Sequence, residues 1–381
     1  PARRAFLQQS LVELSQNLQK KGQTLLGFAG SPSELLAQLL KTPHAPQKIY
    51  LEQATNSRTQ QRNSQLAKIA TENSVQLTEL NLSLLIPPEA LPMRLEETPE
   101  VFTKFRKWVE KEADFGRPCK PIEQLPPPSR WQADVQLLQP VKAFFQSSSQ
   151  VNPHFHGGEN SAWQRLRHYL WQTDQIQHYK ETRNVLFNFD DSSKLSPWLA
   201  LCCISPRCVY EQVKEYECQR IQNESTYWLI FELLWREHFK LLALKHGSRL
   251  FELSGPQKKP PAQLEGLQTQ QKLYFKWRNG ETDADFVNAN MIELKKTGWM
   301  SNRGRQNVAS YLAKTLRVNW TWGARWFAER LIDYDVESNW GNWAYLAGVG
   351  NDPRDRKFNI QRQADMYDPE GLYQNRWLPG R

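Results

Sequence analysis

The feature that most constrains the fold of this chain is a change of pattern along its length. Short apolar segments typical of buried strands lie at 24–28, 47–51 and 75–79. They alternate with helical patterns, of which the clearest covers residues 5–20. Strands that alternate with helices indicate a parallel α/β sheet. The chain enters this pattern on a helix, so we expect the first strand of the sheet to be absent from it.

A proline-rich segment separates this region from the rest of the chain. Residues 117–156 hold seven of the 23 prolines, three of them consecutive at 126–128. Such a segment is typical of a linker that lies over the surface. After it the patterns are almost all helical. We therefore predict an α/β domain at 1–116, a linker at 117–155 and an all-α domain at 156–381.

Charge and cysteine content narrow the class of protein. The formal net charge of +9 favours polyanionic partners, although a basic protein without such a partner stays an alternative. No apolar run reaches the ~18–20 residues that span a bilayer, so we expect no membrane partner. The five cysteines are odd in number and lack metal-site spacing, which favours a reduced, intracellular protein, cytoplasmic if bacterial. The missing first strand implies an incomplete N-terminus, so no targeting signal is assigned.

The helix predicted at 226–245 carries aromatic and charged side chains on one face. Trp228, Glu232, Trp235, Arg236 and Phe239 follow helical spacing and share that face. One interpretation is an ordinary Glu–Arg pair beside core aromatics, worth roughly 0.3–0.5 kcal/mol. The other is a cleft in which Arg236 meets an anion while Glu232 and Trp235 meet a planar partner. Spacing alone leaves both open.

Polar side chains also gather at the starts of two other predicted helices. Ser192, Ser193 and Lys194 precede the helix that begins near Pro197. Their hydroxyl and N–H groups either cradle phosphate oxygens or simply cap the helix. The second cluster consists of Asn302, Arg303, Arg305 and Gln306.

The segment 331–350 contains two carboxylates, Asp333 and Asp335, followed by Asn339. Paired acids with an amide can indicate a metal site or a glycosidase pair. No third ligand or histidine lies nearby, so we predict no metal ligand here.

Together these segments resemble the flavin domain of DASH cryptochromes, members of the photolyase–cryptochrome family. The matching strings, in chain order, are ETRN, SSKLSPWLAL, ISPR, ESTYWLIFELLWRE, LKHGSRLF, GWMSNRGRQNVASYL, LIDYDVESNWGNWAY and AGVGNDPRDRKFN. FLQQSL and LPMRLEETPEVFTKFRKWVEK in the N-terminal half are similar to the same family. The resemblance implies a photolyase-type α/β domain followed by a helical domain that holds FAD. It also suggests methenyltetrahydrofolate as an antenna.

The resemblance implies which residues hold the cofactor. The positions that match contacts to the FAD phosphates and ribose are Tyr179, Ser192, Ser193, Lys194, Leu195 and Ser196. Those that match the surroundings of the pyrophosphate and flavin ring are Arg236, Asn302, Arg305, Asp333 and Asp335. Asn339 matches the residue that faces flavin N5. Hydroxyls and cations on a diphosphate, with carboxylates on N–H and O–H groups, form a chemically coherent set.

The same resemblance implies light-driven repair of cyclobutane pyrimidine dimers. Glu232, Trp235 and Tyr345 match positions that line the pocket for the dimer. Flipping a dimer out costs less in a single strand than in a duplex, which fits the single-strand preference that the resemblance implies. We expect a monomer acting on single-stranded DNA or another nucleic acid. The alternatives are a blue-light receptor without repair activity and a basic nucleic-acid binder without flavin, the latter disfavoured by the retained Asp333, Asp335, Asn339 and Arg236.

Trp343 and Trp320 match the inner members of the family's tryptophan electron-transfer chain. The third position carries Leu267, which cannot be oxidised in this way. Oxidisable aromatics near these segments in sequence are Tyr274, Trp277 and Trp322. Further departures from the family pattern are Val185, Cys202 and the segment 282–288. They predict a locally altered cleft rim.

Overall fold

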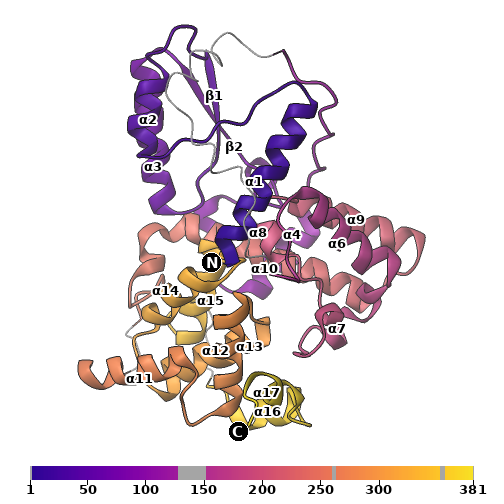
Figure 1. The fold of residues 1–381 in the computed structure, drawn as a ribbon, viewed down its shortest axis with the longest axis vertical. Helices are drawn as coiled ribbons and strands as arrows, with labels where there is room; N and C mark the ends of the chain where they lie inside the picture. The colour runs from indigo at the N-terminus through magenta and orange to yellow at the C-terminus, as the bar shows by residue number, and fades with distance from the viewer. Residues whose placement is uncertain (1, 128–151, 260–262, 352–356, 381) are drawn as a thin grey trace.

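The computed structural model describes residues 2–127, 152–259, 263–351 and 357–380. An N-terminal α/β region lies above a larger helical region in the view of Figure 1. The expected fold class, a parallel α/β domain followed by a helical one, is therefore confirmed.

In the described residues the sheet consists of two parallel strands. β1 covers Lys48–Glu52 and β2 covers Gln76–Leu80, in a register that places Lys48 opposite Gln76. The helices of this region are α1 (Ala2–Lys20), α2 (Pro32–Leu39), α3 (Ser57–Glu72) and α4 (Phe102–Glu112). α3 forms the crossover that a parallel pair requires. Its first turn is capped by Asn56, whose side chain accepts a hydrogen bond from the amide of Thr59.

The strand expected at 24–28 is a wrong prediction. These residues follow the turn that closes α1 and form no strand, although the side chains of Leu25, Leu26 and Phe28 are partly buried. A strand exists only where a neighbour supplies its backbone hydrogen bonds. Among the described residues, β1 and β2 pair with each other, and neither forms a ladder of hydrogen bonds with 24–28.

From residue 156 onward the named elements are helices and short helical turns. The longer ones are α6 (Glu159–Arg167), α9 (Pro206–Gln219), α10 (Glu224–His246), α11 (Leu267–Asn279), α12 (Asp285–Thr297), α13 (Asn302–Ser310), α14 (Trp320–Arg330), α15 (Val336–Ala347), α16 (Ile360–Tyr367) and α17 (Leu372–Trp377). Two short helices, α7 (Tyr179–Thr182) and α8 (Ser196–Ala200), lie on either side of the serine-rich segment.

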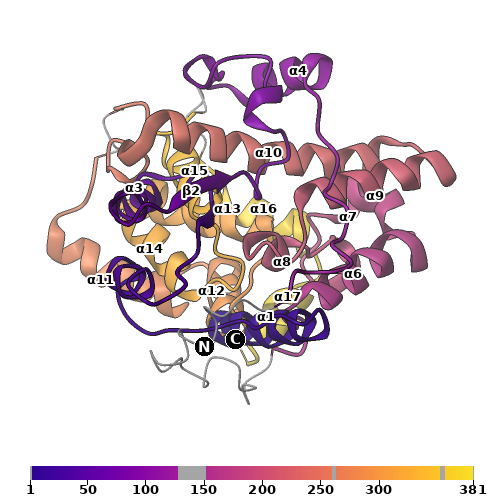
Figure 2. The same ribbon diagram turned by 90° about the horizontal axis from the view of Figure 1, so that it is seen from above.

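Helix α10 is the structural axis of the helical region. Figure 2 shows it running across the molecule, with α4 on one side and most of the other helices on the opposite side. Its N-terminus is capped by Asn223, whose side chain accepts hydrogen bonds from the amides of Ser225 and Thr226. One buried core cluster joins residues of α10 between Leu229 and Leu241 to α4, α6, α9 and the segment 84–86. The other consists mainly of α11–α15.

Most of the linker predicted at 117–155 lies outside the described residues, and the domain boundaries stay a prediction. Its described ends are irregular, apart from one isolated bridge between Asn152 and Phe155. None of the described helices combines the length and apolar character that crossing a membrane requires.

Candidate functional site

A cavity of about 370 Å³ opens where α10, α13 and α15 face the segment 192–200. Its volume is in the usual range for a small-molecule site. The predicted cofactor residues that line it are Tyr179, Ser192, Ser193, Lys194, Leu195, Ser196, Arg236, Asn302, Arg305, Asp333 and Asp335. Glu232, Trp235 and Tyr345 line it as well. A smaller cavity of about 80 Å³ shares its floor and adds Asn339 and Trp343.

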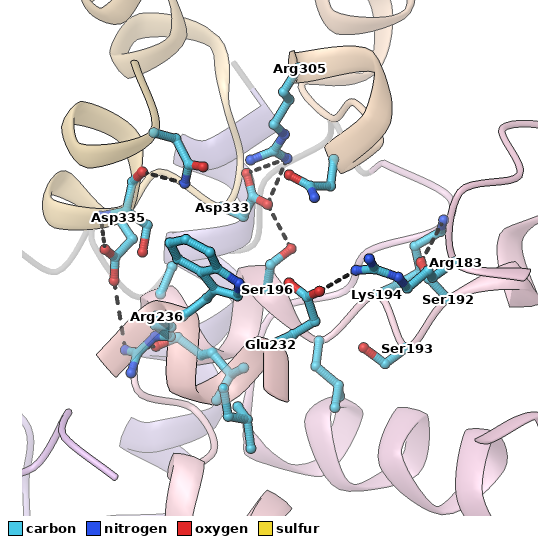
Figure 3. A pocket seen from close by; sticks show the side chains of 18 of the residues that line it. Arg183, Ser192, Ser193, Lys194, Ser196, Glu232, Arg236, Arg305, Asp333 and Asp335 are labelled. Carbon is cyan, nitrogen blue, oxygen red and sulfur yellow. Dashed lines mark hydrogen bonds and ion pairs between the residues drawn. The ribbon is translucent and has the colours of Figure 1, made fainter. Parts of the chain in front are cut away.

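The serine-rich wall is fixed from behind by Arg165. This buried guanidinium donates hydrogen bonds to the main-chain oxygens of Ser193, at 2.8 Å, and Ser192, at 2.9 Å. It also pairs with Asp190. Because Arg165 occupies these carbonyl oxygens, the cavity side of the loop is left with its hydroxyl groups (Figure 3). Such a surface suits the oxygen atoms of a phosphate.

Lys194 adds a buried cation to the same wall. Its backbone is left-handed, with φ of 55°, a conformation that costs free energy for a residue other than glycine. Its ammonium lies 4.2 Å from the centre of the Trp299 ring and 3.1 Å from the hydroxyl of Ser192. Burial lowers the pKa of Lys194 to about 8. A bound anion would therefore stabilise the charged form of this side chain.

Two carboxylates form the floor. Asp333 accepts two hydrogen bonds from Arg305, at 3.0 and 2.8 Å, and one from the hydroxyl of Ser196, at 2.6 Å. Asp335 caps α15 through the amide of Ser338. It lies 3.7 Å from Arg236 and 3.3 Å from Lys240. Burial opposes ionisation of Asp335, but these two cations hold its pKa below the usual value.

At the mouth, Glu232 forms an ion pair with Arg183 (Figure 3). Burial raises the pKa of Glu232, while the Arg183 charge opposes that rise. The guanidinium of Arg183 also lies 5.3 Å from the centre of the Trp228 ring. An aromatic wall continues inward, where the rings of Trp235 and Tyr345 are 5.9 Å apart. The mouth thus combines a carboxylate, a cation and flat apolar surfaces, which suits a planar polar ligand.

Asn339 is buried on the smaller cavity, with its side-chain nitrogen hydrogen-bonded to the main-chain oxygen of Ala324 at 3.1 Å. This bond fixes the amide plane of Asn339. Asn302 lies at the start of α13 and lines both cavities.

The predicted aromatic residues separate into two groups. Trp343 lines the smaller cavity and contacts the ring of Trp277 at 6.0 Å. The ring centres of Trp277 and Tyr274 are 6.0 Å apart, and those of Tyr274 and Trp322 are 5.6 Å apart. Trp320 shares the buried cluster, but it does not line either cavity, and its ring contact is to Trp340. Leu267 is 62% exposed at the start of α11.

Sequence reasoning missed several residues of the site. Arg183 lines the cavity. It belongs to the string ETRN, which carries the family resemblance, and this is the sequence signal that could have indicated it. Trp299 lines the cavity, and its indole N–H is buried without a hydrogen-bond partner among the described residues. This unpaired donor, together with Lys194 and the hydroxyl groups, fits an anionic ligand such as the diphosphate of FAD.

Comparisons with known proteins identify the family of this chain. The family described as the FAD binding domain of DNA photolyase matches residues 228–380, and the family described as DNA photolyase matches residues 1–129. A cryptochrome DASH of Synechocystis is 46% identical over an alignment of 389 positions, which covers 100% of this chain and 77% of that protein. One from Gloeobacter violaceus is 44% identical over 391 residues, covering 100% of this chain and 75% of the relative.

The chain belongs to the DASH cryptochromes. A crystal structure of a Synechocystis cryptochrome superimposes with a TM-score of 0.87 at 43% identity, covering 99% of this chain and 78% of that one. An archaeal photolyase from Sulfolobus tokodaii, solved with two FAD molecules, has a TM-score of 0.80 at 26% identity and covers 99% of this chain and 79% of that one. As a DASH cryptochrome, the protein is a photolyase-like flavoprotein with an FAD-binding helical domain.

Proposed function

We propose that this protein repairs cyclobutane pyrimidine dimers in single-stranded DNA, using FAD and blue light. The observation that carries the proposal is one continuous cavity with two chemically different ends. Its floor and serine-rich wall suit FAD, and its mouth, around Glu232 and Trp235, suits a flat pyrimidine ligand. FAD supplies the light-driven electron when bound, and the following steps concern the side chains of this chain.

The wall and floor would hold FAD. Ser192, Ser193 and Lys194 would contact the diphosphate, because hydroxyl groups and a buried ammonium are its natural partners. Arg236 and Arg305 would add positive charge, each already oriented by a carboxylate of the floor. Tyr179, Leu195, Ser196 and Asn302 would complete the contacts, and Asn339 would face the flavin ring.

The mouth would bind and orient the dimer. Glu232 would accept hydrogen bonds from pyrimidine N–H groups, while Trp235 and Tyr345 would cover the apolar face of the dimer. The Arg183 ion pair holds Glu232 at this position before any ligand arrives. Aromatic walls would exclude water from the region between the two ends of the cavity.

Nucleic-acid binding is supported by paired cations and aromatics near the mouth. Lys180 and Arg183 lie 5.1 and 5.3 Å from the Trp228 ring, and Arg303 lies 4.7 Å from the Tyr367 ring. Cations beside stacking surfaces are the usual means of binding single strands. We further propose that the protein acts as a monomer, and a methenyltetrahydrofolate antenna stays a prediction.

The deciding experiment is a repair assay with thymine dimers in a defined single strand and in the matching duplex. We expect efficient loss of dimers from the single strand under blue light, little loss from the duplex and none in the dark. A protein that holds FAD but repairs neither substrate would contradict the repair proposal. That outcome would favour a blue-light receptor. In such a receptor the rings from Trp343 toward the surface would pass an electron to the flavin, and the flavin's redox state would be the signal.

A further inference from the structure

The carboxyl edge of the sheet contacts the floor of the cavity. β1 ends at Glu52, and the residues that follow it, Thr55 and Asn56, are buried against the helical domain. β2 ends at Leu80, and the main-chain oxygen of Ser83 accepts a hydrogen bond of 2.6 Å from Arg236. Segments after the carboxyl ends of parallel strands commonly build ligand sites. Here the segment after β2 contacts Arg236, which lines the cavity, and the segment after β1 contacts Glu337, whose partner Lys240 also pairs with Asp335 of the cavity floor.

Glu337 is the link between the segment after β1 and that floor. Its carboxylate oxygen Oε1 accepts hydrogen bonds from the hydroxyl of Thr55, at 2.7 Å, and the side-chain amide of Asn56, at 2.8 Å. Its other oxygen, Oε2, lies 3.3 Å from the ammonium of Lys240. The same ammonium lies 3.3 Å from Asp335. One buried cation is therefore shared by a cavity carboxylate and by the carboxylate that contacts the N-terminal domain.

The charges in this network are balanced only when all members are present. Two cations, Arg236 and Lys240, face two carboxylates, Asp335 and Glu337, and all four side chains are largely buried. A buried charge that loses its partner is strongly destabilised, so neighbours rearrange to compensate. Without Glu337, Lys240 would have Asp335 as its remaining carboxylate partner among those described. Asp335 would then turn toward Lys240 and away from Arg236 and the cavity.

We propose that Glu337 is a positioning residue through which the carboxyl edge of the sheet preorganises the flavin site. This inference rests on the proposed binding of FAD to the cavity. The N-terminal domain then acts on the flavin site directly, by fixing which partners Lys240 and Arg236 use. Thr55 and Asn56 transmit this effect because they hold one carboxylate oxygen of Glu337.

The test is a titration of apoprotein with FAD, followed by flavin fluorescence. Glu337→Gln, which keeps the shape of the side chain but removes its charge, should raise the Kd for FAD about tenfold, the effect of losing a hydrogen bond to a charged group. Thr55→Val should raise it less. The double variant should bind FAD no more weakly than Glu337→Gln alone, because both changes break one connection. Additive effects, or an unchanged Kd in both single variants, would overturn the proposal.

Glu100→Gln is the matched control. Glu100 also connects the N-terminal region to α10, through Lys245 at 2.9 Å and His246 at 3.0 Å, but it does not line either cavity. It should lower the Tm as the Glu337 variant does and leave the Kd for FAD within about twofold. An equal rise of the Kd in Glu100→Gln would show that general loosening between domains is responsible, and the proposal would fail.

A second readout needs no flavin. Hydrogen–deuterium exchange of the apoprotein should become faster in the first turn of α15, where Asp335 caps the amide of Ser338, in both Glu337→Gln and Thr55→Val. The same exchange in Glu100→Gln should match the wild-type chain. Unchanged exchange in the Thr55 variant would contradict the positioning role even if Glu337→Gln does not fold. A wild-type chain that binds no FAD would instead count against the proposed function, and the exchange result would still decide this inference.

Discussion

The indole ring of Trp343 lies 6.0 Å from that of Trp277, and the two planes meet at 77°. Trp277 is fully buried, and Tyr274, whose ring also contacts it, is partly exposed. A continuous row of oxidisable rings thus leads from the smaller cavity toward the surface. Leu267, which has no ring and is 62% exposed, is not part of this row.

This row predicts how the bound flavin is reduced under light. Trp343→Phe should nearly abolish photoreduction by a mild thiol and leave the FAD content unchanged, because the ring nearest the cavity would no longer donate an electron. Trp277→Phe should slow photoreduction more than Trp320→Phe, since Trp277 contacts Trp343 directly. The measurement is flavin absorbance under blue light. A normal photoreduction rate in Trp343→Phe would contradict the electron-transfer roles proposed for all these residues. A slower rate in Trp320→Phe than in Trp277→Phe would favour a route through Trp320.

Arg236→Ala should weaken FAD retention. The change removes a guanidinium that lines the cavity and leaves Asp335 with Lys240 as its remaining cation partner. A lost hydrogen bond to a charged group corresponds to roughly 1.5–3 kcal/mol, or about ten- to a hundredfold in Kd. The control is Arg207→Ala, since Arg207 also donates to the N-terminal region, at the main-chain oxygen of Leu85, but does not line the cavity. Equal FAD loss in both variants would contradict a direct role for Arg236.

Glu232→Ala should reduce dimer repair much more than FAD content, because Glu232 lies at the mouth and not at the flavin floor. Both quantities are measured on the same preparation, from dimer loss under blue light and from flavin released on denaturation. Glu224→Ala serves as the control on the same helix, since Glu224 pairs with Lys180 and is mostly exposed. Repair that survives in Glu232→Ala would show that the dimer does not bind where we propose.

Binding to undamaged single-stranded DNA should weaken linearly in log Kd against log salt, as counterion release requires. Arg303→Ala should lower the magnitude of that slope by about 0.7 if Arg303 neutralises one phosphate of a single strand. Fluorescence anisotropy at several salt concentrations gives the slope. A slope equal to that of the wild-type chain would place Arg303 outside the DNA contact.

Glu293 should make a contribution to stability that falls between pH 5 and pH 7, whereas buried His238, whose pKa is lowered from 6.5 to about 4, makes one that rises up to about pH 6.5. Burial raises the pKa of Glu293 from 4.5 to about 7, and its carboxylate accepts a hydrogen bond of 2.6 Å from Tyr373. Between these two values the folded state holds a proton that the unfolded state releases, so the free energy of unfolding decreases as pH rises, by roughly 3 kcal/mol for this group. Glu293→Gln should remove this falling contribution, so the free energy of unfolding of the variant should rise relative to that of the wild-type chain as pH increases from 5 to 7. Urea unfolding at several pH values tests this, and an unaltered pH dependence in the variant would refute it.

The parts of the fold that depend on local pattern were predictable. The segments around β1 and β2 carry their own apolar character, and the structure places these strands within one residue of the expected ranges. The segment 24–28 has the same apolar character, yet it is not a strand, because strand formation depends on a partner elsewhere in the chain. The amino-acid composition of the segment 24–28 does not show whether another strand lies close enough to pair with it.

The candidate site shows the same division. Ser192, Ser193 and Asp333 lie in contiguous strings that carry the family resemblance, so the sequence could indicate them. The contact of Glu337 with Thr55 joins residues that are 282 positions apart, and no local pattern marks it. The unpaired N–H of Trp299 likewise becomes visible only once the wall of the cavity is assembled around it.

Helix α10 has a consequence for how the protein unfolds. It contributes Leu234 and Leu241 to one core cluster and Ala243 to the other. The carboxylate of Glu237, near the middle of the helix, accepts hydrogen bonds from the main-chain N–H groups of Leu85 and Ile86. If either cluster unfolds, α10 loses part of its packing, and the other cluster loses the helix against which it packs. Thermal unfolding of the helical domain is therefore expected to be a single cooperative transition, in which flavin release and loss of helix occur at the same temperature.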